Sequence, residues 1–131
     1  LGLPPKRRSY QPVALEPTQA RGMDHRLALV VEDYRRRVRA GDVRSDAESL
    51  AVLTSLRLIA ADFKLPAAER LVQHLRAQGE SVVLFSSFVS PLVLLQQRLG
   101  GALLTGRQKP EERQMAVDRF QNGSTDLLLA T

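Results

Sequence analysis

The chain has 131 residues, of which 44% are hydrophobic and 25% are charged. This balance excludes a disordered tail or a fibrous repeat, and the length allows one domain or part of one. There is no cysteine, which excludes disulfides and thiolate chemistry, and His25 and His74 lie too far apart for a metal-binding spacing. No apolar stretch approaches the ~20 residues of a membrane span, and no secretory leader opens the chain. We therefore expect no metal site, no membrane partner and an intracellular protein, in the cytoplasm or nucleoid of a bacterium or the nucleus of a eukaryote.

Positive charge is concentrated in the first part of the chain. Lysine and arginine number 19 against 14 acidic residues, a net charge of +5. The first 60 residues hold 11 cations and 7 anions, so they carry +4 of that excess. It gathers at residues 6–8 and at Arg35, Arg36, Arg37 and Arg39, and such clusters attract phosphate. These four arginines form a possible basic patch for DNA or a partner, although they could simply solvate a helix end, where cations suit the helix dipole.

The first half of the chain predicts an extended arm followed by two helices. Residues 1–17 contain four of the seven prolines, which favours an extended backbone with a short strand at 13–15. Thr18 can cap a helix that runs to about Ala40. A second helix is expected to start at Ser45 or Asp46 and to end near Ala61.

The second half alternates helices with short apolar runs. Uninterrupted apolar runs favour strands covered on both faces, and the short links between them imply right-handed crossovers within a parallel sheet. The expected helices are 66–78, 90–99 and 110–121, and the expected strands are 81–86, 102–105 and 126–130. The predicted fold class is therefore α/β, a three-layer parallel sheet of about three strands preceded by the arm and two helices. We divide the chain into a linker and helical segment, 1–64, and a lobe, 65–131.

Hydroxyl side chains follow all three predicted strands. Ligands of open parallel sheets bind beyond the carboxyl ends of the strands, where hydroxyls and free amides suit phosphate oxygens. The alternative is that each hydroxyl only caps the next helix. The residues at these ends are Ser86 and Ser87, then Thr105, Gly106 and Arg107, and finally Thr131.

Sequence motifs of catalysis are missing from the chain. There is no GxxxxGK[ST] phosphate loop, no DExx box after an apolar strand and no serine nucleophile elbow. The pair Glu111 and Glu112 opens a helix, where the dipole favours anions. We therefore assign no catalytic residue.

Several segments together resemble a known family. They are Phe85-Ser86-Ser87-Phe88, Thr105-Gly106, Arg113 with the run from Phe120 to Gly123, and Leu127 to Thr131. In this order they resemble the second RecA-like lobe of superfamily-two helicases, most closely the Swi/Snf-like DNA-dependent ATPases. The opening LPPKRR with VALEPTQ resembles that family's linker, and LTSLRL resembles its LR-containing helix.

The resemblance implies a fragment of a larger motor. The chain stops within motif five, without the later arginine-bearing motif six and without the first lobe that carries the phosphate loop. The parent protein is then expected to be an ATP hydrolase that uses ATP and Mg, whereas this chain alone binds neither and is inactive. Whether the chain counts as an enzyme is therefore left open.

The resemblance also implies partners. Double-stranded DNA would be gripped through its backbone, without sequence specificity, in chromatin remodelling or DNA repair. The residues at the strand ends, joined by the charges of Arg107 and Lys109, would make these contacts, and the lobe would close on ATP held by the missing first lobe. The family's strand order puts the third strand between the first two, which leaves the first at an uncovered edge and predicts self-association.

Two alternatives remain open at the level of sequence. The chain could be a non-catalytic helicase-like module that only docks nucleic acid or a protein. It could also be an unrelated small α/β domain that holds a phosphorylated metabolite.

Overall fold

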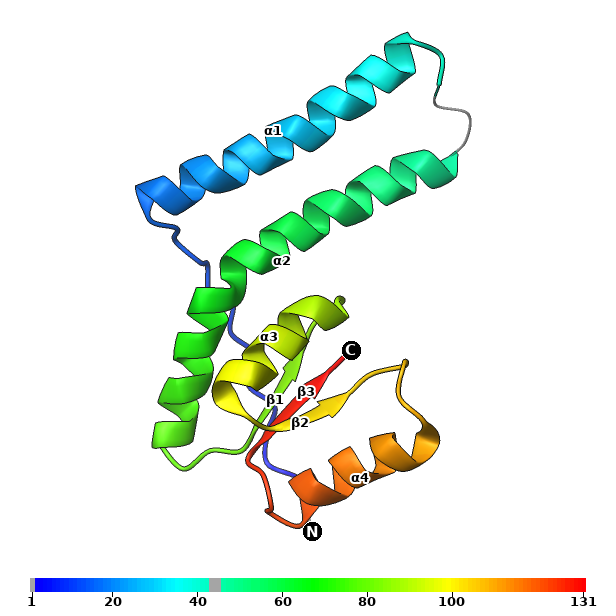
Figure 1. Cartoon of the computed structure of the whole chain (residues 1–131). Coiled ribbons are helices and arrows are strands. Elements are labelled where there is room, and N and C mark those ends of the chain that lie inside the picture. The colour runs from blue at the N-terminus through cyan, green and yellow to red at the C-terminus, as the bar shows by residue number, and fades with distance from the viewer. Residues whose placement is uncertain (1, 43–45) are drawn as a thin grey trace.

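The computed structural model describes residues 2–42 and 46–131, and shows a helical hairpin projecting from a small α/β lobe (Figure 1). Its elements are α1 (Pro17–Arg39), α2 (Asp46–Ala77), β1 (Val82–Phe85), α3 (Val89–Leu99), β2 (Ala102–Leu104), α4 (Pro110–Gln121) and β3 (Leu127–Ala130). The expected order of elements is therefore confirmed, except that two of the predicted helices are one. Ser45, a candidate helix start, lies outside the described residues.

The helical hairpin consists of α1 and the first part of α2, which lie antiparallel (Figure 1). The hydroxyl groups of Tyr34 and Ser49 lie 2.9 Å apart across it. Nearer the lobe, Arg26 forms an ion pair of 3.3 Å with Asp62 and lies 5.6 Å from the centre of the Phe63 ring. These contacts join the two helices at two places along the hairpin.

The start of α1 differs from the prediction. The helix begins at Pro17, with Glu16 rather than Thr18 as its N-cap, and the backbone amide of Glu16 donates to Gln19 Oε1 at 3.2 Å. Proline suits the first helical position because the amide that it lacks would have no partner there. The prediction at Thr18 was wrong because it used the hydroxyl and ignored the proline.

Helix α2 differs most from the prediction made from the sequence. We expected one helix to end near Ala61 and another to begin at Pro66, but a single helix runs through both positions. Proline inside a helix removes the hydrogen bond to the carbonyl four residues earlier, here that of Asp62, and kinks the helix without necessarily ending it. Figure 1 shows the resulting change of direction along α2.

The three strands form a parallel sheet in the order β1-β3-β2, which confirms the expected order. Val82 is paired with Leu127, and Ala102 with Leu128. One face of the sheet packs on α2 and α3 through a core that includes Val72, Leu92, Leu95, Leu127 and Leu129. The other face packs on α4 through Ala102, Ala116 and Leu128. The three-layer α/β class is therefore confirmed.

The layers do not cover β1 equally. All four residues of β3 are buried, as expected of a strand covered on both faces. On β1, Val83 and Phe85 point to the side opposite α3 and are 42% and 74% exposed. Helix α4 contacts β2 and β3, so the prediction of two-sided burial was wrong for β1.

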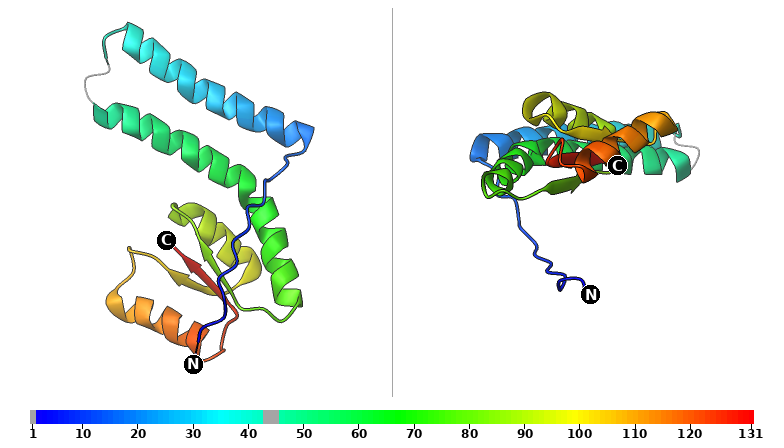
Figure 2. Two further views of the ribbon diagram at one scale, coloured as in Figure 1. Left: turned by 180° about the vertical axis from the view of Figure 1, so that it is seen from behind. Right: turned by 90° about the horizontal axis from the view of Figure 1, so that it is seen from below.

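The arm is extended, but it contains no strand. Residues 2–14 are exposed and in neither helix nor strand, so the strand predicted at 13–15 is absent (Figure 2). Pro12 and Pro17 flank that segment and cannot donate to a strand ladder. Within the described part of the chain, no helix is long and apolar enough to cross a membrane, and no cluster of His, Asp and Glu could hold a metal ion.

Candidate functional site

The carboxyl ends of the three strands meet at one edge of the sheet, which we call the carboxyl rim. Ser86, Thr131 and Thr105 follow β1, β3 and β2, so Thr131 lies between the other two. The amide of Ser86 donates to the carbonyl of Ala130 at 3.0 Å, and that of Thr131 to the carbonyl of Leu104 at 3.1 Å. The structure thus places these candidates on one side of the molecule.

Thr105 differs from the expectation of an accessible hydroxyl. It is 3% exposed, and its amide donates to Gln108 Oε1 at 2.8 Å. The turn that follows β2 folds back over it, since the amide of Gln108 in turn donates to the Thr105 carbonyl at 3.3 Å. Thr105 therefore shapes the turn and offers no surface hydroxyl to a ligand.

The rest of this turn is open to solvent. Gly106, Arg107 and Lys109 are all exposed between the end of β2 and the start of α4. Neither Arg107 nor Lys109 forms an ion pair with a carboxylate of the described residues. Both charges therefore lie at the rim without a carboxylate partner in an ion pair among the described residues.

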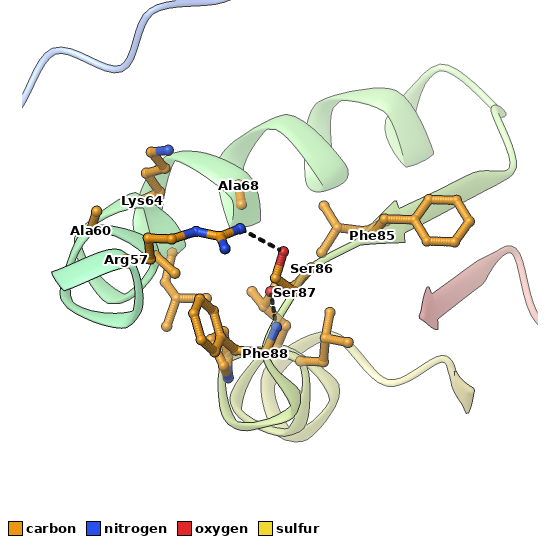
Figure 3. A pocket seen from close by; sticks show the side chains of 14 residues that line it. Arg57, Ala60, Lys64, Ala68, Phe85, Ser86, Ser87 and Phe88 are labelled. Atoms are coloured by element: carbon orange, nitrogen blue, oxygen red, sulfur yellow. Dashed lines mark hydrogen bonds between the residues drawn. The ribbon is translucent and has the colours of Figure 1, made fainter. Parts of the chain in front are cut away.

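A cavity of about 360 Å³ opens beside the other end of the rim, between α2 and the turn from β1 to α3 (Figure 3). Its apolar wall is formed by side chains from α2, from α3 and from the turn before α3. They include Ala60, Ala61, Leu65, Ala68, Phe88, Pro91, Leu92 and Leu95. Its polar members are Arg57, Lys64, Ser86 and Ser87. Three of the lining residues on α2 are alanines, whose small side chains fill little of this space.

Hydrogen bonds hold the turn at the mouth of the cavity. Ser86 Oγ accepts from the amide of Phe88 at 3.1 Å, and Arg57 Nη2 donates to Ser87 Oγ at 3.4 Å. Figure 3 shows both bonds, with the rings of Phe88 and Phe85 pointing in different directions. Ser86 is thus partly occupied as a local cap, whereas Ser87 is exposed and already faces a cation.

The predicted basic patch lies elsewhere. Arg35, Arg36, Arg37 and Arg39 sit at the end of α1 that is remote from the sheet (Figure 1). Three of them pair with acids: Arg35 with Glu32 at 3.8 Å, Arg36 with Asp33 at 3.5 Å, and Arg37 with Asp33 at 3.2 Å and Glu48 at 3.7 Å. Residues 32–48 carry five arginines and five carboxylates, a net charge of zero. The structure does not bring this patch to the carboxyl rim, and its charge is largely compensated.

Sequence reasoning missed Arg57 and Lys64 as site residues. They are seven residues apart, two turns of one helix, so they share a face of α2. The signal was present in the sequence, but ending the helix at Ala61 separated the two cations. Predicting residues 57–68 as one helix would have placed both cations on one face of it, although not which element that face meets.

Comparison with known proteins fixes the family. The model of the helicase conserved C-terminal domain matches residues 64–131, more than half of the chain. The chain belongs to this family. The helicase C-terminal domain here also resembles a solved structure, described as the SWI2/SNF2 ATPase C-terminal domain of Sulfolobus solfataricus, with a TM-score of 0.65 and 17% identity.

The structural match extends beyond the lobe to most of the chain. It covers 89% of this chain and 59% of the Sulfolobus chain, so this helicase C-terminal domain spans little more than half the length of that relative. No curated protein matches the chain. The expected second RecA-like lobe is therefore confirmed as a fold, while the division at residues 64 and 65 stays a prediction.

Proposed function

We propose that this chain is the part of a helicase-like motor that grips the sugar-phosphate backbone of DNA. The carboxyl rim carries this proposal: exposed Ser87, Gly106, Arg107, Lys109 and Thr131 follow three neighbouring strands. The Glu112 carboxylate accepts from the Lys109 backbone amide at 2.9 Å, but among the described residues neither the Arg107 nor the Lys109 side chain forms an ion pair. Hydroxyls, amides and cations are the groups that bind phosphate oxygens. Membership of the helicase C-terminal family supports the same role.

The rim provides contacts of two kinds. Cationic side chains neutralise phosphates and release counterions, which supplies affinity that depends on salt. Hydroxyls and amides fix the position of the backbone without reading the bases. Binding should therefore be independent of sequence and strongest at low salt.

In the intact motor, ATP would be held chiefly by the first lobe, and this lobe would close on it. The chain itself carries no phosphate loop and no DExx box. ATP and Mg would therefore belong to the assembled parent, and we expect this chain alone to show no ATP turnover. Alternate closing and opening of two gripping lobes would move such a motor along the backbone.

Titration of a fluorescent duplex with the chain over about 50–200 mM salt tests the proposal. We expect log K to fall linearly with log[salt], with a slope of about −0.9 for each phosphate neutralised. Arg107→Gln should weaken binding to all sequences alike and should reduce the magnitude of this slope by about 1.

Arg119→Gln is the matched control. Arg119 is exposed, lies at the end of α4 near the start of β3, and forms no ion pair among the described residues. The variant Arg119→Gln therefore removes the same charge as Arg107→Gln, but at the edge of the sheet where the strands begin. If both variants lower affinity and slope equally, binding reflects net charge alone and the carboxyl rim is not the grip.

A further inference from the structure

The cavity beside the rim has more apolar wall than phosphate binding requires. Phosphate needs charge and donors, which Arg57, Lys64 and Ser87 supply at the mouth. The interior is lined instead by alanine, leucine and proline side chains and by the Phe88 ring. A volume of about 360 Å³ lies within the range of small-ligand pockets, about 300–1,000 Å³. The walls therefore fit a flat apolar group that is attached to an anion.

The charge of the lining is of one sign. Arg57 and Lys64 are its only ionisable side chains, and neither forms an ion pair within residues 2–42 and 46–131. The Arg57 guanidinium is held toward the turn by its hydrogen bond to Ser87 Oγ. An anionic ligand would meet two uncompensated cations at the entrance and no carboxylate.

We propose that this cavity binds an unpaired nucleobase, with the adjoining phosphate on Arg57 and Lys64. The inference rests on the proposed function, and it names the nucleic acid that the site prefers: a strand with at least one unpaired nucleotide. A half-buried aromatic ring beside an arginine is the combination on which unpaired bases stack. The cavity opens at the carboxyl rim, so a backbone held there passes its entrance.

A fully paired duplex must spend free energy to place a base in the cavity, whereas an unpaired nucleotide does not. Its bases are stacked and paired, and turning one out costs a few kcal/mol. A single strand or a gap presents the base without that cost. The chain should therefore bind an oligonucleotide with unpaired bases more tightly than a duplex with the same number of phosphates.

The test fills the cavity without changing its charge. Ala61→Leu places a larger side chain into the wall, and Ala77→Leu is the control because Ala77 is exposed at the end of the same helix. Oligonucleotides containing 2-aminopurine, single-stranded and duplex, report both affinity and base stacking. For the wild type and Ala77→Leu we expect fluorescence quenching with the single strand and a preference for it of about 5- to 160-fold, the size of one stacked base. Ala61→Leu should remove the quenching and most of that preference, while its duplex affinity stays unchanged.

Phe88→Leu provides a second variant, because it keeps an apolar side chain while removing the aromatic face. It should reduce quenching and the single-strand preference in a chain whose circular dichroism is that of the wild type.

Equal binding of single strand and duplex by the wild type, or full quenching with Ala61→Leu, overturns the inference and leaves the grip on the backbone standing. Absence of salt-dependent binding to either oligonucleotide removes the proposed function itself. If Ala61→Leu leaves oligonucleotide binding intact but abolishes binding of a peptide of alternating aspartate and leucine, the cavity docks protein and the inference is wrong.

Discussion

Replacing Gly101 by alanine should destabilise the lobe more than any other glycine substitution that the structure describes. Gly101 lies between α3 and β2 with a φ of 92°, in the left-handed region. A Cβ added there would lie 2.8 Å from the carbonyl oxygen of Leu127 and 3.0 Å from its Cγ. Leu127 is fully buried in the middle strand, so neither atom can move aside.

The magnitude follows from two costs and one gain. A left-handed backbone costs an alanine about 1–2 kcal/mol, and overpacking adds about 1–3 kcal/mol. The lower entropy of the unfolded chain returns about 0.4–1 kcal/mol. The two costs sum to about 2–5 kcal/mol, so the net loss is about 1–4.6 kcal/mol, which at roughly 4 °C per kcal/mol for a chain of this length lowers Tm by about 4–18 °C.

Two other glycines separate these causes. Gly79 has a φ of 79° but no atom within 4 Å of its added Cβ, so Gly79→Ala carries the backbone cost alone, about 1 kcal/mol after the gain. Gly106 has neither a left-handed φ nor a close neighbour, so Gly106→Ala should stay within about 0.5 kcal/mol of the wild type. Urea denaturation of the three variants measures the differences. Equal losses at Gly79 and Gly101 would refute the reasoning, because the contact with Leu127 would then cost nothing.

Two further predictions concern the packing of the lobe and the arm. Arg76 on α2 contacts the end of α3 and the residue before β3: its Nη1 lies 2.8 Å from the Leu99 carbonyl oxygen and its Nη2 lies 2.9 Å from Asp126 Oδ1. Because the Arg76 and Asp126 side chains are partly exposed, Arg76→Ala should lower the free energy of unfolding by about 1–2 kcal/mol, measured by thermal unfolding. Asp126→Asn should cost less, since the carbonyl contact survives; a larger loss there would show that the ion pair dominates. Removal of residues 1–14 should change the free energy of unfolding by less than about 0.5 kcal/mol, because residues 2–14 are exposed. A larger decrease would mean that the arm packs on the lobe.

The lobe could be predicted from sequence because its signals are local and agree with one another. Pro110 and the pair Asn122-Gly123 mark the ends of α4, and the predicted bounds of 110–121 are those observed. Short apolar runs between such signals gave the strands to within one residue at each end. Strand order was not contained in these patterns and came from the family resemblance.

The errors share a physical cause. Pro66 is compatible both with the first turn of a helix and with a bend inside one, and only packing along α2 selects the second. The burial of Thr105 depends on the turn folding back through Gln108, a contact that no spacing rule indicates. The cavity needs α2 and the turn after β1 to be placed in space, so Arg57 and Lys64 could not be joined to Ser87 from local signals.

One continuous helix, α2, joins the hairpin to the lobe. Residues 46–65 span about 30 Å at 1.5 Å per residue. A tilt of about 10° at Pro66 would therefore move the far end of this segment by about 5 Å. Arg57 and Lys64 lie on the hairpin side of Pro66, nine and two residues before it, so such a tilt would move both cations relative to the turn after β1.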